Sequence, residues 1–248
     1  MIPKNQVYRF NWNAPIVADP FNPAIIYHGG NKVLKTTDCG QSWTAISGDL
    51  TRNDTAKQGD GGAPFTNEGA GGEVYNTLAY IACSPITQGE IWTGSDDGLV
   101  HLTRDGGNTW SNITPAGLGE TLVNSIEVSY HTPGKAIIAT TGYKMNDFSP
   151  SFFITYDYGK TWSKQTNGFE AKDFCRVVRE DRVKKGLLYA GTERGLYIST
   201  NDGLDWQRFQ LNLPVVAIND LTIADNDLVA ATSGRAFWIL DDLSPLQQ

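Results

Sequence analysis

The chain of 248 residues has little cysteine and little histidine, with three residues of each. Cys39, Cys83 and Cys175 lie far apart and include no Cys-x-x-Cys pair. This spacing indicates neither a disulfide framework nor a zinc site. The histidines are dispersed over different segments, so we expect no shared metal site, no metal and no cofactor.

Basic charge and long apolar runs are lacking as well. Lysine and arginine total 20 against 27 acidic residues, which gives a net charge of −7. This balance argues against a nucleic-acid partner, because phosphate backbones require a basic face. No segment is apolar enough for membrane insertion, and the first residues, MIPKNQVYRF, do not have the apolar core of a signal peptide. The compartment therefore stays open.

One short motif recurs through the chain. TTDCGQSW (36–43), TRDGGNTW (103–110) and TYDYGKTW (155–162) share Ser/Thr-x-Asp-x-Gly-x-Ser/Thr-Trp, and STNDGLDW (199–206) is a looser copy with Asn201 in the aspartate position. The tryptophans are 67, 52 and 44 residues apart. The motif positions that we expect to be structural are Asp38, Gly40, Trp43, Asp105, Gly107, Trp110, Asp157, Gly159, Trp162, Asn201, Gly203 and Trp206.

Each motif follows the same pattern of short apolar strands, here named a, b and c, and the tryptophan begins a fourth strand, d. Repeats of four short strands every 40–50 residues are typical of β-propeller blades. We therefore predict one all-β domain over 1–248, a propeller of about five four-stranded blades. The predicted blades lie near 14–47, 77–114, 123–166, 174–210 and 218–242.

The last repeat loses its motif, so it has no strand d of its own. An additional strand is predicted at 6–11, ahead of the first blade. It either completes the fifth blade and closes the ring or belongs to a missing blade of a larger propeller.

Each part of the motif has a structural task. The aspartate accepts hydrogen bonds from its own turn, the glycine permits a positive φ, and the tryptophan packs between neighbouring blades. All copies are c–d turns, which share one edge of the blades with the a–b turns. Each turn also supplies only one carboxylate, which is too little for Ca²⁺ because this ion needs six to eight oxygen ligands. We therefore expect ligands at the opposite edge, formed by the b–c and d–a loops.

The motif resembles the Asp-box, or BNR repeat, of sialidases, xyloglucanase-type glycoside hydrolases and sortilin-type propellers. The stretches IWTGSDDGLVHLTRDGGNTW and FCRVVREDRVKKGLLYAGTERGLYIS are similar to part of large bacterial sortilin-like or BNR-repeat glycosyl hydrolase proteins. The resemblance implies a propeller, and the longer relatives are usually exported. It gives no catalytic residue: the chain has no Arg-Ile-Pro motif of sialidases and no second propeller to form a xyloglucanase cleft.

Candidate binding residues lie in the b–c and d–a loops and on the inner strands. The two largest insertions are the d–a loop 51–76 and the b–c loop 142–151. For each candidate the alternative is ordinary packing or ion pairing. The candidates are Tyr143, Lys144, Asp147, Phe148, Arg176, Arg179, Arg235 and Asp97.

Two functions remain open. The first is a non-catalytic module that binds a glycan or a protein. Its further partners would be a second copy of the chain or the missing blades of a longer protein. The second is a glycoside hydrolase, or a fragment of one, which requires two carboxylates about 5–10 Å apart on the loop edge. The sequence alone does not decide whether the chain is an enzyme.

Overall fold

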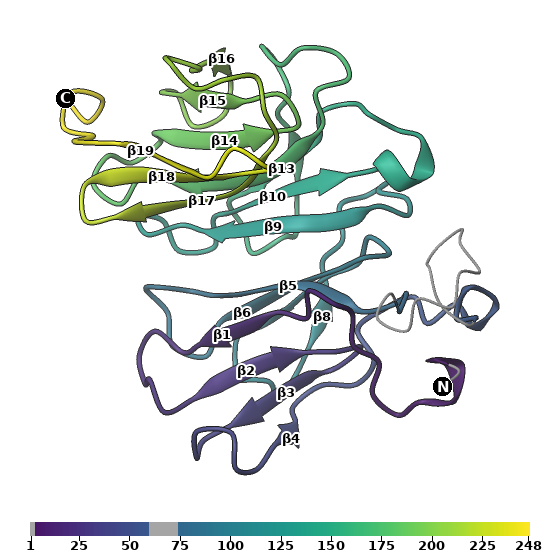
Figure 1. Cartoon of the computed structure of the whole chain (residues 1–248). Helices are drawn as coiled ribbons and strands as arrows, with labels where there is room; N and C mark the ends of the chain where they lie inside the picture. Colours follow the sequence, from purple (N-terminus) through teal and green to yellow (C-terminus); the bar gives the residue numbers. More distant parts are fainter. Residues whose placement is uncertain (1–2, 60–73) are drawn as a thin grey trace. The chain divides into compact units, whose positions relative to one another are not determined.

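The computed structural model describes residues 3–59 and 74–248, which form antiparallel sheets without an α-helix (Figure 1). None of the helical segments in these residues has the length and apolar character needed to cross a membrane. The chain divides into two compact units, 1–128 and 129–248.

The strands form five sheets that follow one another along the chain, as predicted from the repeats. Four sheets have four strands and the fifth has three. In chain order the strands are β1 (Ile16–Ala18), β2 (Ile26–Gly29), β3 (Val33–Thr36), β4 (Thr44–Ala45); β5 (Leu78–Cys83), β6 (Ile91–Ser95), β7 (Val100–Thr103), β8 (Ser111–Asn112); β9 (Leu122–Val128), β10 (Ala136–Thr141), β11 (Phe152–Thr155), β12 (Ser163–Lys164); β13 (Cys175–Glu180), β14 (Leu188–Thr192), β15 (Leu196–Ser199), β16 (Gln207–Arg208); β17 (Ile218–Ala224), β18 (Asp227–Thr232) and β19 (Phe237–Leu240). Three short 3-10 turns complete the elements: η1 (Pro3–Asn5), η2 (Thr55–Lys57) and η3 (Tyr143–Met145).

Apolar side chains fill the space between consecutive sheets within each unit. In the first unit, Tyr27 and Val33 of the first sheet pack with Leu78 and Ile81 of the second. In the second unit, one cluster joins β10 and β11 to the fourth sheet, and another joins the fourth sheet to the fifth. Every residue of β10 and β14 is buried, so these strands are covered on both faces.

The N-terminal segment 6–11 does not form the strand expected there. Its Arg9 is buried in the first unit instead, where the guanidinium donates to Asp49 at 2.7 Å and to the Asn76 carbonyl at 3.2 Å. Phe10 stacks on His28 of β2 with 4.9 Å between ring centroids. These contacts hold segment 6–11 against the first sheet, so it does not supply a fourth strand to the fifth sheet. In the described residues the fifth sheet has three strands.

The repeated motif forms the same hydrogen-bonded turn each time. In the second copy, Thr109 donates its amide to Asp105 Oδ1 and its hydroxyl to Oδ2, while Thr103 Oγ1 accepts from the Gly107 amide. The first and third copies have the same bonds around Asp38 and Asp157. The fourth keeps the geometry with reversed polarity: Asn201 Nδ2 donates to Asp205 Oδ2 at 2.9 Å.

In the second, third and fourth sheets the motif and the a–b turn lie at the same edge, hereafter the motif edge. The backbone amides of Gly106, Tyr158 and Asp202 in the motifs donate to the carbonyls of a–b turn glycines at 89, 134 and 186. At the opposite edge, hereafter the loop edge, b–c loops bond to the start of strand a; Glu193 N, for example, donates to Phe174 O at 3.0 Å. The predicted separation of turns and loops is therefore present in these sheets.

The motif glycines also determine how closely neighbouring sheets approach. Gly203 has a φ of +83°, and a Cβ there would lie 2.7 Å from Ile154 Cδ1 of the preceding sheet. Gly107 has a φ of +99° and would meet Ile46 at the same distance. Both conformation and space therefore exclude a side chain at these positions.

The motif aspartates are expected to titrate well below ordinary aspartates. Hydrogen bonds from the closing Ser or Thr, first from its hydroxyl and then from its amide, hold the pKa of Asp38, Asp105 and Asp157 at about 2, against an ordinary 3.8. Because the folded pKa is lowered, the stabilisation is present above pH ~4 and is lost as the pH falls through 2. Carboxyl NMR titration of labelled aspartate checks this: Thr109→Val should raise the pKa of Asp105, and a wild-type Asp105 pKa near 3.8 would contradict it.

Candidate functional site

Three aromatic side chains gather at the loop edge of the second unit. Tyr143 of η3 stacks on Phe174 with 5.6 Å between centroids and 19° between planes, and Phe148 meets Phe174 at 6.2 Å. Phe174 itself is buried, whereas Tyr143 is 39% and Phe148 41% exposed. The b–c loop 142–151 thus places two accessible rings on a buried aromatic base.

An ion pair borders these rings. The Arg176 guanidinium lies 5.2 Å from the centre of the Phe174 ring and donates through Nε to Glu193 Oε2 at 2.8 Å. Its Nη2 reaches the same oxygen at 2.5 Å. The contact with the aromatic ring and the ion pair with the carboxylate together restrain the position of the guanidinium. We define the aromatic shelf as Tyr143, Phe148, Phe174, Arg176 and Glu193.

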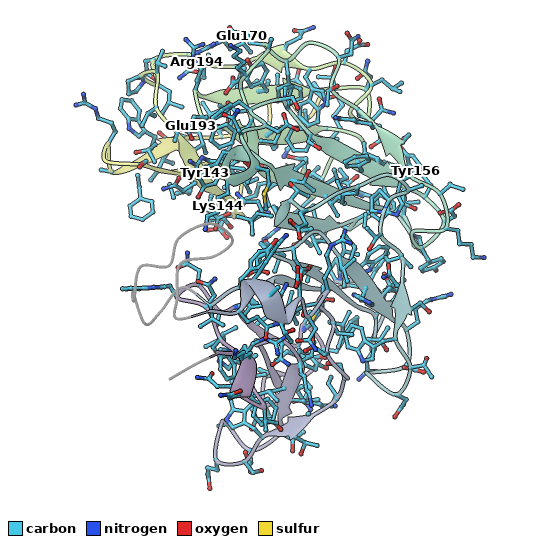
Figure 2. The ribbon with its side chains drawn as sticks, turned by 90° about the vertical axis from the view of Figure 1, so that its right-hand side faces the viewer. Tyr143, Lys144, Tyr156, Glu170, Glu193 and Arg194 are labelled. Atoms are coloured by element: carbon cyan, nitrogen blue, oxygen red, sulfur yellow. The ribbon has the colours of Figure 1, made fainter. Side chains whose placement is uncertain are left out.

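A second group of charged residues continues from the shelf. Glu170 of the d–a loop accepts from Arg208 Nη1 at 2.8 Å and lies 3.7 Å from Arg194 Nη1. Figure 2 shows Glu170, Arg194, Glu193, Tyr143 and Lys144 following one another from top to bottom, with Tyr156 on the other side of the ribbon. The exposed surface therefore combines aromatic rings with charges of both signs.

Polar side chains fix the loops that carry the shelf. Asp173 has no exposed surface; its Oδ1 accepts from the Arg194 amide at 3.0 Å and its Oδ2 from the Tyr197 hydroxyl at 3.0 Å. In the other loop, Asp147 Oδ1 accepts from the amide and hydroxyl of Ser149. The Ser149 hydroxyl bond, followed by the amide bond, lowers the pKa of Asp147. The loop backbones are thus held by their own side chains.

The sequence candidates on blade three and blade four divide into two groups. Tyr143, Phe148 and Arg176 come together in the shelf, and Lys144 is exposed beside them. Asp147 is engaged in holding its own loop. Arg179 lies elsewhere: its Nε donates to Leu221 O at 2.7 Å and its Nη2 to Asp220 at 2.6 Å, so it links β13 to β17.

The remaining candidates do not join the shelf. Arg235 is exposed in the b–c loop of the fifth sheet. Asp97 belongs to the first unit and has no exposed surface; it accepts from Ser95 Oγ at 2.5 Å, the Arg52 amide at 2.8 Å and Asn76 Nδ2 at 2.6 Å. This carboxylate fastens the loop after Arg52 and is not presented to a ligand. Of the loop 51–76, residues 60–73 lie outside the described residues.

Sequence reasoning missed Phe174, Glu193, Arg194 and Glu170. Glu193 and Arg194 follow β14 at the loop position that Asp96 and Asp97 occupy in the second sheet, so alignment of the repeats was a usable signal. Phe174 carried no such signal, because its role depends on the η3 loop reaching it from another repeat. Within the described residues, no three His, Cys, Asp or Glu side chains form a metal cluster.

No family model matches the chain, and no curated protein matches it. Solved structures do. A GH74 xyloglucanase from Xanthomonas campestris matches with a TM-score of 0.64 and 14% identity, over 92% of this chain and 36% of that one. An ancestral GH74 enzyme matches with a TM-score of 0.61 and 18% identity, over 95% of this chain and 32% of that one. The fold is a β-propeller.

This likeness extends to the computationally designed Ika8 protein, with a TM-score of 0.55 and 12% identity over 91% of this chain and 58% of that one. Enzymes and a designed protein therefore share the architecture. The chain spans about a third of the length of the two GH74 structures. The comparison establishes the fold and confirms the all-β propeller class predicted from the repeats, but a shared fold does not assign a binding or catalytic site.

Proposed function

We propose that this chain is an Asp-box β-propeller that acts as a non-catalytic binding module for a glycan or a protein, with the aromatic shelf as its binding surface. The observation that carries the proposal is the pair of exposed rings, Tyr143 and Phe148, on the buried Phe174. Rings restrained before binding lose little entropy on contact, and they stack on sugar faces or on apolar side chains.

The charges around the rings support binding rather than chemistry. Glu193 is neutralised by Arg176, and Glu170 by Arg208. A glycosidase requires one carboxyl that keeps its proton and a second that is free to attack or to activate water. Two carboxylates engaged by arginines suit recognition of hydroxyl or amide groups at the edge of a stacked ligand.

The Asp-box assignment is supported by the hydrogen bonds of the four turns. The carboxylate of each aspartate serves its own turn at the motif edge. The repeated acid therefore has a structural task, and ligand contacts are left to the loop edge.

The alternative is a glycoside hydrolase or a fragment of one, and it is favoured by the likeness to GH74 enzymes. It predicts hydrolysis of a glycan substrate by the purified chain. Activity that is abolished by Glu193→Gln and retained by Asp105→Ala would establish the alternative in place of the binding module.

The binding module is tested with glycan and peptide arrays. Tyr143→Ala is expected to weaken binding of the captured ligand about 30-fold, because central aromatic anchors contribute ~2 kcal/mol or more. The matched control is Tyr156→Ala, which removes a tyrosine 52% exposed at the motif edge. Equal loss in both variants, or unchanged binding by Tyr143→Ala, would exclude the shelf as the site.

A further inference from the structure

A buried lysine of the third sheet contacts two carboxyl groups of the fourth, all within the second unit. Lys135, in the a–b turn before β10, has no exposed surface. Its Nζ donates to Glu180 Oε1 at 2.6 Å and to Asp202 Oδ1. The side chain of Glu180, the last residue of β13, also has no exposed surface, and that of Asp202 is 26% exposed. One amine thus meets two carboxyl groups where water has little access.

Hydrogen-bonded backbone holds these three groups in place. The Lys135 amide donates to Thr132 O at 3.1 Å, and the Asp202 amide donates to Gly186 O at 2.9 Å. Glu180 pairs with Leu188 in the ladder between β13 and β14. The amine and the two carboxyl groups are therefore brought together by folding, which gives them a high effective concentration.

The repeated turn does not need Asp202. In the fourth motif the turn is closed by Asn201 and Asp205, whose side chains bond to each other and whose backbones are bonded as in the other copies. Asp202 occupies the variable position between the motif asparagine and the motif glycine. The other copies carry Cys39, Gly106 and Tyr158 at this position. The carboxyl group of Asp202 is therefore available for a task outside its own turn.

Lys135 is likewise particular to its sheet. It is the residue before strand b whose carbonyl accepts from the residue after strand a. Glu90 and Leu187 occupy the same position in the second and fourth sheets. The amine and its carboxyl partner thus occur together only between the third and fourth sheets of the described repeats.

A hydroxyl group contacts the other oxygen of the same carboxyl. Tyr156 donates through its hydroxyl to Asp202 Oδ2 at 2.8 Å, and the Lys135 Nζ lies 6.0 Å from the centre of the Tyr156 ring. Burial, followed by the bond to Asp202, raises the pKa of Tyr156 well above its ordinary value, so the hydroxyl keeps its proton at neutral pH. The carboxyl of Asp202 therefore has an amine at one oxygen and a hydrogen-bond donor at the other.

We propose that Lys135 and Asp202 join in an intramolecular amide, or isopeptide, bond, with Glu180 as the proton carrier. The bond between Lys135 Nζ and Asp202 Cγ forms, and the bond between Cγ and one carboxyl oxygen breaks. Glu180 takes a proton from the ammonium group and passes it to the oxygen that leaves as water. The Tyr156 hydroxyl stabilises the negative oxygen of the tetrahedral intermediate.

The reaction needs no co-reactant other than a proton. One ammonium group, two carboxylates and one proton from solvent become an amide, a carboxylic acid at Glu180 and one water molecule, so no buried charge is left. The ion pairs of Lys135 are the reactant state, which exists once the second unit has folded. The product links residues that are 67 positions apart and fastens the third sheet to the fourth.

The mass of the intact, purified chain tests the proposal. We expect the folded full chain to be lighter than its sequence mass by one water molecule. Trypsin does not cleave after an amidated lysine, so the digest should contain a branched peptide that joins residues 105–144 to residues 195–208. Tandem mass spectrometry of this peptide should place the branch at Lys135 and Asp202.

Four variants separate this bond from other changes. Lys135→Arg keeps the charge but should have the full sequence mass, whereas the control Lys160→Arg, at an exposed lysine, should lose water like the wild type. Asp202→Asn should lose ammonia instead of water, because a nitrogen is then the leaving group. Glu180→Gln should slow the reaction roughly 100-fold, measured in chains pulse-labelled during synthesis.

The full sequence mass for the folded wild type after prolonged incubation at neutral pH would overturn the proposal, even where a variant fails to fold. Loss of water that persists in Lys135→Arg would overturn it as well, because a succinimide at an Asp-Gly pair such as 202–203 has the same mass. The aromatic shelf lies at the loop edge and takes no part in this reaction, so loss of binding in Tyr143→Ala leaves this test unaffected.

Discussion

Replacing Lys135 by methionine is expected to lower the free energy of unfolding by about 3–5 kcal/mol. Lys135 has no exposed surface, although it lies in the a–b turn before β10. Its ammonium group donates to Glu180 Oε1 at 2.6 Å and to Asp202 Oδ1. Glu180 is also fully buried, at the end of β13, so the lysine joins two sheets through a desolvated ion pair.

The cost comes from the carboxylate that is left behind. Methionine fills a similar volume, so packing changes little, but Glu180 becomes a buried charge without its cation. Lys135→Met combined with Glu180→Gln should therefore recover part of the loss. Urea unfolding measures both, with the exposed Lys160→Met as control, for which a change within ±0.5 kcal/mol is expected. Wild-type stability of Lys135→Met would show that the pair does not join the sheets.

Trp206→Ala is expected to lower the free energy of unfolding by about 3–5 kcal/mol, and Trp43→Ala by much less. The two residues occupy the same motif position, yet Trp206 is 2% exposed and Trp43 40% exposed. Trp206 stacks on Phe152 of the preceding sheet, with 5.3 Å between centroids and 18° between planes. Its removal opens the core between two sheets, whereas the ring of Trp43 meets His28 of its own sheet, with 5.9 Å between centroids.

Thermal and urea unfolding of the two variants tests whether the motif tryptophan acts through the neighbouring sheet. Trp110 provides an intermediate case, because it is partly buried and donates Nε1 to Ile46 O of the preceding sheet at 2.8 Å. Its replacement should fall between the other two. Equal destabilisation at Trp43 and Trp206 would mean that the motif stabilises its own turn and not the contact between sheets.

The repeat predicted the fold correctly, because its strands and turns depend on residues that are close together in the sequence. Tight turns with positive-φ glycine, such as Gly203, and alternating strands are encoded within a few residues. The exposure of each tryptophan is not encoded in this way. It depends on which sheet lies next to it, and the same letters therefore gave a buried Trp206 and an exposed Trp43.

The candidate site shows the same division. Tyr143 and Phe148 were predicted as candidates because they lie in an insertion in a b–c loop. Asp97 was selected because it lies in a b–c loop, but three donors and complete burial make it a structural residue. Segment 6–11 contains valine, tyrosine and phenylalanine, which favour a strand, but Arg9 bonds to Asp49 and Asn76 in the first unit. Contacts between residues distant in sequence decided these cases.

We propose that the motif edge stabilises the fold and that the loop edge binds the ligand. One paired measurement tests this division: array binding and thermal unfolding of Tyr143→Ala and Asp105→Ala. Tyr143→Ala is expected to lose binding at an unchanged melting temperature, and Asp105→Ala is expected to melt earlier but, while folded, to bind like the wild type. Loss of binding in a folded Asp105→Ala protein, with binding kept by Tyr143→Ala, would contradict this division.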